Sequence, residues 1–525
     1  MDEEWKNLPS LPYSKFDLGR IALSSLIMTY SKLVKMSSEK HIVLPSDDPL
    51  LNISATKAAE EIRTGKLKSY DLVSAYLNRI RDVNHFINAV TEVFEASALN
   101  KAKEVDDYLE KIRTDPEEIE KLKSEKPLLG LPISIKHSFD YKGYRNVCGL
   151  TYRRHLPPAA EHSVAVERVI NAGAIPICYT NVPGGCMAFE TDNPVYGRTN
   201  NPHDTRVTSG GSSGGEGALI TAQGSLFGIG SDLAGSIRVP SSLNGIYGFK
   251  TGKLTCPSDG HEPNLSLNEE DRGVLAVGPM CRYAEDLPLL HQVLGGRTIA
   301  TRISVLKPSK VFFSIPESRP VLKVADYIKD NINGVSDYLS EAYETPKQEF
   351  DIGKDILELT VLFLHSFFKP KLDCRDLLLP NKQFNVFKEF FKGVLGTSEI
   401  SILNLSAAHG ATSNLTNKSV EEAERHIKVI KKHFENTLGE DGILIFPGLP
   451  DSHYFHNGST QLTGAYTVIF NALGLPSLSV PCGRCKQGYP TSVQIAGSHG
   501  SEPLLMAAAQ KMEERFGGWV KPIPK

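Results

Sequence analysis

A lysine and two serines are the residues of this chain whose types and spacing could carry out chemistry. Lys136 follows an apolar segment, and Ser212 and Ser236 lie in two glycine-rich loops, 24 residues apart. A serine hydroxyl is a poor nucleophile near neutral pH unless a base takes its proton. A lysine can be that base only when it is neutral, and burial favours the neutral amine. The three residues therefore predict a serine nucleophile served by a lysine base, a combination suited to cleaving amides.

The two glycine-rich loops could also bind the oxyanion that forms when a carbonyl is attacked. The run 210–215 precedes a predicted helix, so backbone N–H groups and the positive end of the helix face the same space. The segment 233–236 follows a predicted strand, and successive N–H groups of such a loop can converge on one oxygen. Either loop alone is weak evidence, because most glycine-rich loops are only tight turns.

Ser213 presents a competing motif. Residues 211–215 read Gly-Ser-Ser-Gly-Gly, which fits the G-x-S-x-G elbow of α/β-hydrolases centred on Ser213. That elbow needs a strand directly before it, whereas residues 200–210 are polar and turn-like. We therefore do not expect Ser213 to be the nucleophile.

Helices and strands that alternate around these residues predict the framework that positions them. Helices come first along the chain, and Ser54 is placed to cap the first of them. Such alternation is typical of an α/β layer with a partly parallel sheet. The predicted elements are helices over 55–63, 70–83 and 96–124, a strand over 128–135, a helix over 164–172, a strand over 175–179, a helix over 215–223 and a strand over 226–230.

Composition excludes several other classes of protein. The 525 residues are 40% hydrophobic and 23% charged, as in ordinary globular proteins, and the net charge of −3 gives no footprint for nucleic acid. Eight cysteines are too few for a disulfide scaffold. The CxxC at 482–485 lacks a second CxxC or paired histidines, and His453 and His456 lack partners. We expect neither a metal nor a cofactor.

Two apolar segments leave contact with a membrane open. Residues 1–45 are predicted to form a helical extension, in which an apolar face over 21–34 is too short to span a bilayer. This face could lie on a membrane, although packing on the body of the protein is the commoner outcome. The less regular stretch 297–439 carries an aromatic stripe that could cap a greasy substrate or face the core, and the sequence favours neither. The stripe consists of Phe384, Phe387, Phe390, Phe391, Val394 and Leu395.

Taken together, these motifs resemble the amidase signature family of serine hydrolases. Lys136 matches the lysine of its G-x-P-x-x-x-K segment, residues 210–215 match its GGSSGG run, and residues 232–238 match D-x-G-G-S-x-R. The likeness spans roughly residues 50–515 and is greatest to the second type of the fatty-acid amide hydrolase branch. It implies one catalytic domain over 46–525, with an α/β fold in which helices cover both faces of a large mixed central sheet.

The resemblance also implies a role for each residue. Ser236 is the nucleophile, Ser212 follows a cis peptide bond and relays the proton, and Lys136 is the base. The implied reaction is hydrolysis of fatty-acid primary amides or N-acyl amines through an acyl-enzyme. Alternatives are an amidotransferase-type glutaminase subunit working with a partner, and an inactive lipid-binding homologue. The oxyanion would be held by the backbone N–H groups of Leu233, Ala234, Gly235 and Ser236.

Two positions depart from the family pattern. Ala234 replaces a glycine, and its methyl group would be strained if the backbone there has positive φ. His137 follows the lysine and could perturb it or point away. The resemblance leaves a homodimer and peripheral contact with a membrane open, and it favours a location that is cytoplasmic or peripherally membrane-associated.

Overall fold

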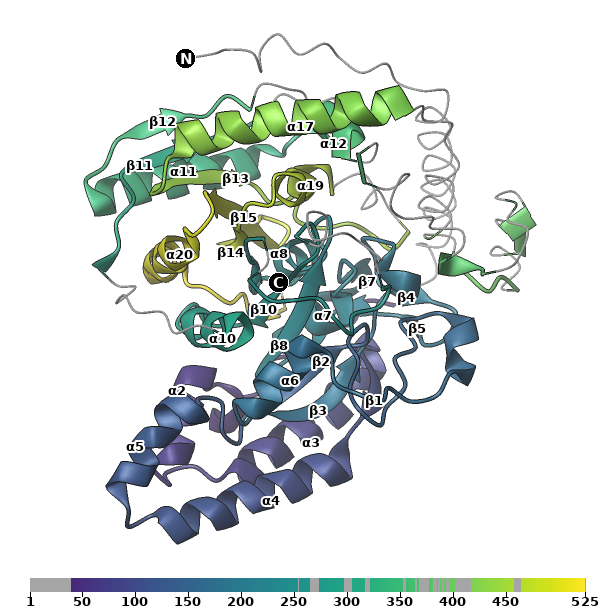
Figure 1. Cartoon of the computed structure of the whole chain (residues 1–525), viewed down its shortest axis with the longest axis vertical. Coiled ribbons are helices and arrows are strands. Elements are labelled where there is room, and N and C mark those ends of the chain that lie inside the picture. The colour runs from purple at the N-terminus through teal and green to yellow at the C-terminus, as the bar shows by residue number, and fades with distance from the viewer. Residues whose placement is uncertain are drawn as a thin grey trace.

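An eleven-stranded mixed sheet runs through the centre of the protein (Figure 1). The strand order is β1-β3-β2-β8-β10-β9-β14-β15-β13-β11-β12. The strands are β1 (Val90–Val93), β2 (Pro132–Lys136), β3 (Ile175–Thr180), β8 (Phe227–Asp232), β9 (Tyr247–Lys250), β10 (Ala276–Cys281), β11 (Lys310–Phe313), β12 (Lys347–Glu349), β13 (Gly442–Pro447), β14 (Ser477–Arg484) and β15 (Pro490–Gly497).

The protein is represented by a computed structural model. It describes residues 39–253, 255–264, 273–296, 305–316, 322–352, 356–363, 366–367, 377–380, 385, 388–389, 391–392, 397–401, 404, 417–457 and 464–524. The apolar face over 21–34 and most of the aromatic stripe lie outside these residues. The domain boundary at residue 45 stays a prediction.

The strands that carry the site are parallel to one another. β2 lies between β3 and β8 and is parallel to both, while β10 pairs antiparallel with β8. All residues of β2, β3 and β8 are buried, as expected for strands covered on both faces. At the other end of the sheet, β11 is parallel to β12 and β13. The mixed sheet therefore has two parallel regions joined by antiparallel strands.

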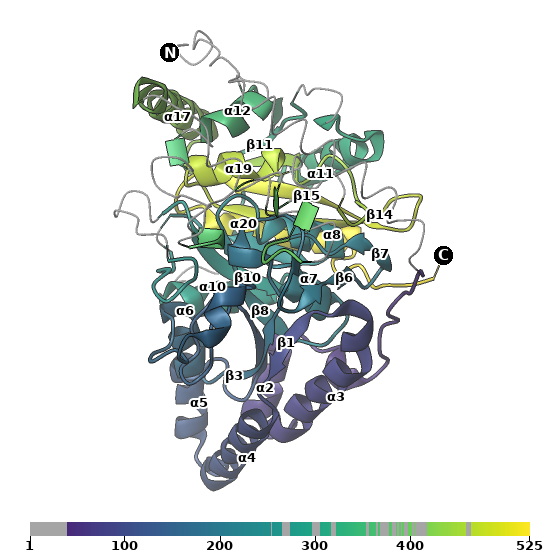
Figure 2. The same cartoon turned by 90° about the vertical axis from the view of Figure 1, so that its right-hand side faces the viewer.

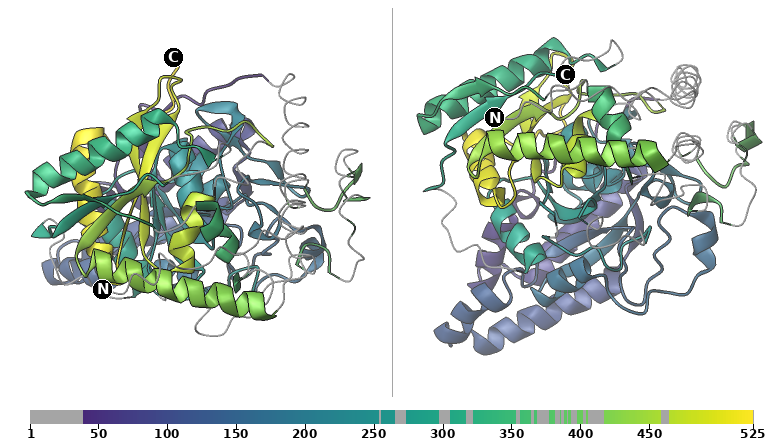
Figure 3. Two further views of the ribbon diagram at one scale, coloured as in Figure 1. Left: turned by 90° about the horizontal axis from the view of Figure 1, so that it is seen from above. Right: turned by 45° about the horizontal axis from the view of Figure 1, so that its top comes forward.

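Helices cover both faces of the sheet (Figure 3). One layer contains α10 (Asp286–Gly295), α11 (Asp326–Tyr343) and α20 (Glu502–Phe516), and the other contains α7 (Gly214–Thr221) and α8 (Arg238–Asn244). Every residue of α7 is buried, because this helix packs in the core between the sheet and its neighbours. The fold is thus the α/β architecture that the sequence predicted.

The N-terminal helices lie at one end of the long axis, opposite the β11–β12 edge (Figures 1 and 2). These helices are α2 (Ala55–Arg63), α3 (Ser69–Ile87), α4 (Glu95–Ile112) and α5 (Pro116–Glu125). The Ser54 hydroxyl caps α2 by accepting from the Lys57 N–H, as predicted. The single helix expected over 96–124 is instead two helices. The break occurs because Pro116 begins α5 and Asp115 caps it.

The remaining helices are α6 (Val164–Asn171), which joins β2 to β3, and α12 (Ile356–Phe363), α17 (Asn417–Leu438) and α19 (Ala465–Ala472). Short 3₁₀ helices cover Pro49–Leu51, Thr151–His155 and Gly184–Cys186. Small two-stranded sheets pair β4 (Asp192–Asn193) with β5 (Gly197–Arg198), and β6 (Asn200–Asn201) with β7 (Asp204–Thr208). None of the described helices is long and apolar enough to cross a membrane.

Candidate active site

Lys136 is the last residue of β2, and the strand carries its side chain into the interior. The side chain is fully buried, and its amine nitrogen lies 2.7 Å from the Ser212 hydroxyl oxygen. Burial lowers the pKa of Lys136 because it penalises the ammonium form, and nearby thiols and carboxylates oppose this shift only in part. The lysine is therefore placed to act as a base toward Ser212.

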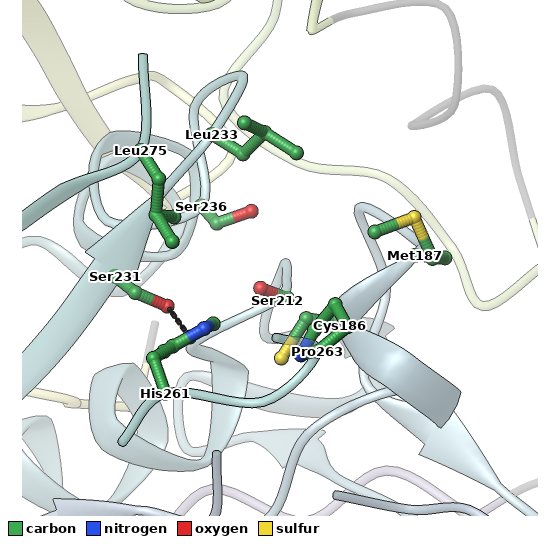
Figure 4. A pocket seen from close by; sticks show the side chains of 9 residues that line it. All are labelled: Cys186, Met187, Ser212, Ser231, Leu233, Ser236, His261, Pro263 and Leu275. Atoms are coloured by element: carbon green, nitrogen blue, oxygen red, sulfur yellow. Dashed lines mark hydrogen bonds between the residues drawn. The ribbon is translucent and has the colours of Figure 1, made fainter. Parts of the chain in front are cut away.

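Ser212 and Ser236 come from different loops and face the same cavity (Figure 4). Ser212 lies just before α7, after a cis peptide bond from Gly211, and Ser236 lies just before α8. The structure thus brings the two predicted serines together. The cavity has about 250 Å³ of empty volume, with Cys186, Ser231 and His261 on its polar side and Met187, Leu233 and Leu275 on its apolar side.

The loop over 233–236 carries the N–H groups predicted to hold an oxyanion. The Gly235 N–H donates to the Asp232 carboxylate at 2.7 Å. Among the described residues, no protein group accepts from the N–H groups of Leu233, Ala234 and Ser236. Three of the four predicted donors are therefore unoccupied, and the fourth is engaged by a carboxylate in this structure.

A buried ion pair holds this loop in place. Asp232 and Arg238 are both fully buried, with 2.9 Å between carboxylate oxygen and guanidinium nitrogen. Arg238 also donates to the Asn471 side chain and to the Thr467 carbonyl. Burial alone would raise the pKa of Asp232, but the Arg238 charge and hydrogen bonds hold this pKa well below its ordinary value. Asp232 therefore stays ionised and anchors the loop through Gly235.

Ala234 does not have the positive φ that would strain its methyl group. The residue of the loop that needs glycine is Gly235, whose φ is +134° and whose Cβ would lie 2.1 Å from the Thr467 hydroxyl oxygen. The Ala234 carbonyl accepts from that same hydroxyl at 2.6 Å. The alanine is thus a mild departure from the family pattern.

His137 points away from the amine of Lys136. Its ring nitrogens contact the Thr91 hydroxyl and the Arg145 carbonyl, and the ring stacks on Tyr179. Burial lowers the pKa of His137 to about 4, so the ring is neutral. Of the two outcomes considered from the sequence, the structure shows the second.

Ser213 is fully buried and is not among the residues that line the cavity. The polar segment before it contains β6 and β7, where we expected only turns, but these strands form a small sheet of their own. They are not the central strand that a nucleophile elbow requires. Ser213 therefore remains excluded as the nucleophile, for a different structural reason.

Glu216 lies inside α7 and is fully buried beneath the lysine strand. Its carboxyl contacts the hydroxyls of Ser134, on β2, and Thr180, at the end of β3. Burial raises the pKa of Glu216 to about 8, although both hydrogen bonds and Lys136 act in the opposite direction. Glu216 is therefore a protonated tie between α7 and the parallel strands near neutral pH.

Four cavity residues escaped the sequence analysis. Ser231, on β8, lies 2.8 Å from both the Lys136 amine and the His261 ring. Cys186 and Cys148 bring their sulfurs within 3.7 Å, and both residues have positive φ. The resemblance marks none of them. Ser231 precedes a recognised motif by one residue, and only this neighbourhood could have suggested it.

The CxxC cysteines lie far from this chemistry in sequence and show no ligand geometry. Cys482 and Cys485 are buried, and their sulfurs contact the Val480 carbonyl and the Ser452 hydroxyl, respectively. Across the described part of the chain, no group of three or more His, Cys, Asp or Glu side chains could hold a metal ion.

Comparison with known proteins agrees with this site. The family model described as Amidase matches residues 71–506. The chain is 34% identical to fatty-acid amide hydrolase 2-A of Danio rerio, over 91% of each chain. It is 32% identical to fatty-acid amide hydrolase 2 of Homo sapiens, over 97% of this chain and 96% of that one.

A solved structure titled fatty acid amide hydrolase has the same fold. It superposes with a TM-score of 0.73 at 21% identity and covers 99% of this chain and 95% of its own. The family match, the two relatives and the shared fold lead to one conclusion. The chain belongs to the amidase signature family and is a hydrolase that acts on amide bonds.

Proposed function

We propose that the chain hydrolyses fatty-acid primary amides or N-acyl amines, with Ser236 as nucleophile, Ser212 as relay and Lys136 as base. The observation that carries the chemistry is the buried lysine amine 2.7 Å from Ser212, beside the cavity that Ser236 faces. A neutral lysine in this position can receive a proton without a histidine.

The reaction would begin when Lys136 takes the proton of Ser212 as Ser212 takes the proton of Ser236. The Ser236 oxygen then attacks the amide carbonyl, and the N–H groups of Leu233, Ala234 and Ser236 stabilise the oxyanion. The proton on Lys136 returns through Ser212 to the amine nitrogen as the C–N bond breaks. Water, activated by the same pair, hydrolyses the acyl-enzyme and restores Ser236.

The cavity wall supports an apolar acyl chain. Met187, Leu233 and Leu275 line the cavity, and they pack in one cluster with Phe363, Phe367 and Val468. An acyl chain placed against this cluster would bury apolar surface, at about 0.8 kcal/mol for each CH₂ group. The curated relatives named for fatty-acid amides agree with this substrate class.

The substrate proposal is tested with primary amides of increasing acyl length. We expect kcat/KM to rise several-fold for each pair of added CH₂ groups until the apolar cluster is filled. Leu275→Ala should lower kcat/KM for long-chain amides more than for acetamide. Rapid cleavage of short or aryl amides without any release of long-chain acid would contradict the lipid assignment and leave the serine–lysine chemistry standing.

The two alternatives are less well supported. The glutaminase alternative finds support in a subunit of the glutamyl-tRNA(Gln) amidotransferase from Caldanaerobacter subterraneus, at 24% identity, below the 34% of the lipid amidase. It predicts release of ammonia from glutamine and tight co-purification with a partner. The inactive-homologue alternative was motivated by strain at Ala234, and the backbone there has no positive φ.

A further inference from the structure

The amine of Lys136 has more partners than a base can freely use. It lies 2.7 Å from the Ser212 hydroxyl, 2.8 Å from the Ser231 hydroxyl and 3.2 Å from the Ser231 carbonyl. A neutral amine offers two N–H donors and one lone pair. The carbonyl can only accept, so it takes one N–H. The other N–H and the lone pair must be divided between the two hydroxyls.

This division decides whether the lysine can work as a base. To receive the Ser212 proton, the lone pair must face Ser212, and the second N–H must then donate to the Ser231 oxygen. The hydroxyl proton of Ser231 therefore needs an acceptor other than Lys136. If no such acceptor existed, Ser231 could donate to the lone pair and compete with Ser212.

His261 is placed to be that acceptor. Its Nε2 lies 2.8 Å from the Ser231 hydroxyl oxygen, and the side chain is buried in the cavity wall (Figure 4). We propose that His261 is a positioning residue, whose unprotonated Nε2 accepts the Ser231 proton and so directs the lone pair of Lys136 toward Ser212. The inference rests on the proposed function, because it explains how the base of that reaction is oriented.

The protonation of the imidazole fits this role. Burial, followed by the nearby positive charge of Lys136, lowers the pKa of His261 to about 3, so the ring is neutral at working pH. The Pro263 backbone acts to raise that pKa, as a carbonyl does when it faces a ring N–H. A proton on Nδ1, toward Pro263, leaves Nε2 free to accept from Ser231.

The backbone holds this ring against the lysine segment. The Asp140 N–H donates to the Gly260 carbonyl at 2.8 Å, and the Glu262 N–H donates to the Ser138 carbonyl at 2.6 Å. Phe139 and His261 form an isolated β-bridge, and their rings meet edge to face at 5.0 Å. The loop that carries His261 is therefore tied to the three residues from Ser138 to Asp140.

The test compares His261→Leu, which removes the acceptor, with His261→Gln, whose amide oxygen can replace it. The readout is the rate constant for labelling of Ser236 by a fluorophosphonate, measured against pH, because this rate does not depend on the natural substrate. We expect His261→Leu to slow labelling at least about tenfold, within the range that positioned proton transfer supplies, and His261→Gln to restore most of the rate.

The pH profile separates positioning from a merely structural effect. In His261→Leu, Ser231 can donate to the neutral amine and stabilise it, so the pKa of Lys136 falls. The acid limb of the profile should therefore move to lower pH while the plateau drops. The other titratable groups that act on Lys136 are Cys186, Cys148, Asp232 and Glu216, and the substitution leaves them in place.

Two controls complete the experiment. His203 is also a buried histidine with a pKa lowered to about 3, and it contacts the Asn244 carbonyl away from the site. His203→Leu should lower the melting temperature without moving the acid limb. In a Ser231→Ala background the competing hydroxyl is gone, so His261→Leu should have little further effect on labelling.

The outcomes are distinct. Equal slowing by His261→Leu in both backgrounds, or an unmoved acid limb with folded protein, overturns the positioning role. Slow labelling in His261→Gln as well as in His261→Leu, with both variants folded, does the same. Wild-type protein that resists the probe contradicts the proposed function itself, and the inference falls with it.

Discussion

The two ends of the central sheet bury different kinds of side chain. Around β2, β8 and the helices that follow the serine loops, the buried groups include Lys136, Glu216, Asp232 and Arg238. In β13, near the other end, Ile443, Leu444, Ile445 and Phe446 are buried. Buried polar groups need their partners, whereas apolar groups lose stability gradually with lost volume. The catalytic end should therefore respond to substitution in activity and stability together, and the β13 end in stability alone.

Removal of Arg238 should have the largest effect. Arg238→Met leaves the Asp232 carboxylate buried without its partner, which we expect to cost about 3–5 kcal/mol of unfolding free energy and most of the labelling of Ser236. Denaturant unfolding and fluorophosphonate labelling measure the two losses. The control is Arg81→Met, which removes an exposed pair with Glu95 and should cost about 0–1 kcal/mol. Similar losses in both variants would contradict the comparison.

Truncation at the β13 end should be felt in stability only. Leu444 is fully buried, and Leu444→Ala should lower the free energy of unfolding by about 2–5 kcal/mol through lost burial and the cavity left behind. The labelling rate of the folded fraction should stay that of the wild type. A slower rate at unchanged occupancy of the folded state would show that β13 shapes the site.

Glu216 should make stability depend on pH. Its folded pKa of about 8 lies above the ordinary value of 4.5, so its contribution is fully present below about pH 4.5 and is lost as pH rises through 8. Glu216→Gln mimics the neutral form. Relative to wild type, the variant should gain stability between pH 5 and pH 9 in thermal unfolding. The exposed Glu349→Gln is the control, and a constant difference for Glu216→Gln would refute the protonated tie.

The smallest effect is expected at Ala234. Because its φ is not positive, Ala234→Gly should change stability by less than about 1 kcal/mol and leave the labelling rate close to wild type. The neighbouring Gly235→Ala is the matched contrast, since its Cβ would meet the Thr467 hydroxyl at 2.1 Å. A large gain in rate from Ala234→Gly would show that the alanine impairs the oxyanion loop.

The sequence predicted the elements whose signals are local. The Ser54 cap and the apolar periodicity gave α2 its observed bounds, and the apolar run before Lys136 predicted β2. The break between α4 and α5 was missed although Asp115-Pro116 signalled it, because the charged pattern continues across it. β6 and β7 were missed because they are short and polar.

The catalytic trio could be predicted because its residues lie in recognisable motifs. Ser231 and His261 could not be assigned, since their value depends on contacts with Lys136 across the fold. The same holds for the engagement of Gly235 by Asp232, which depends on loop geometry and not on residue type. Whether Ala234 is strained likewise required its backbone angle.

The most direct measurement of the central claim is the site of fluorophosphonate modification. Trypsin should release residues 207–238 as one peptide, which contains Ser212, Ser213 and Ser236, so fragmentation must assign the adduct. The account predicts modification at Ser236 that disappears in Ser236→Ala and slows at least about a hundredfold in folded Lys136→Met. An adduct on Ser213, or a labelling rate that does not change in Lys136→Met, would contradict it.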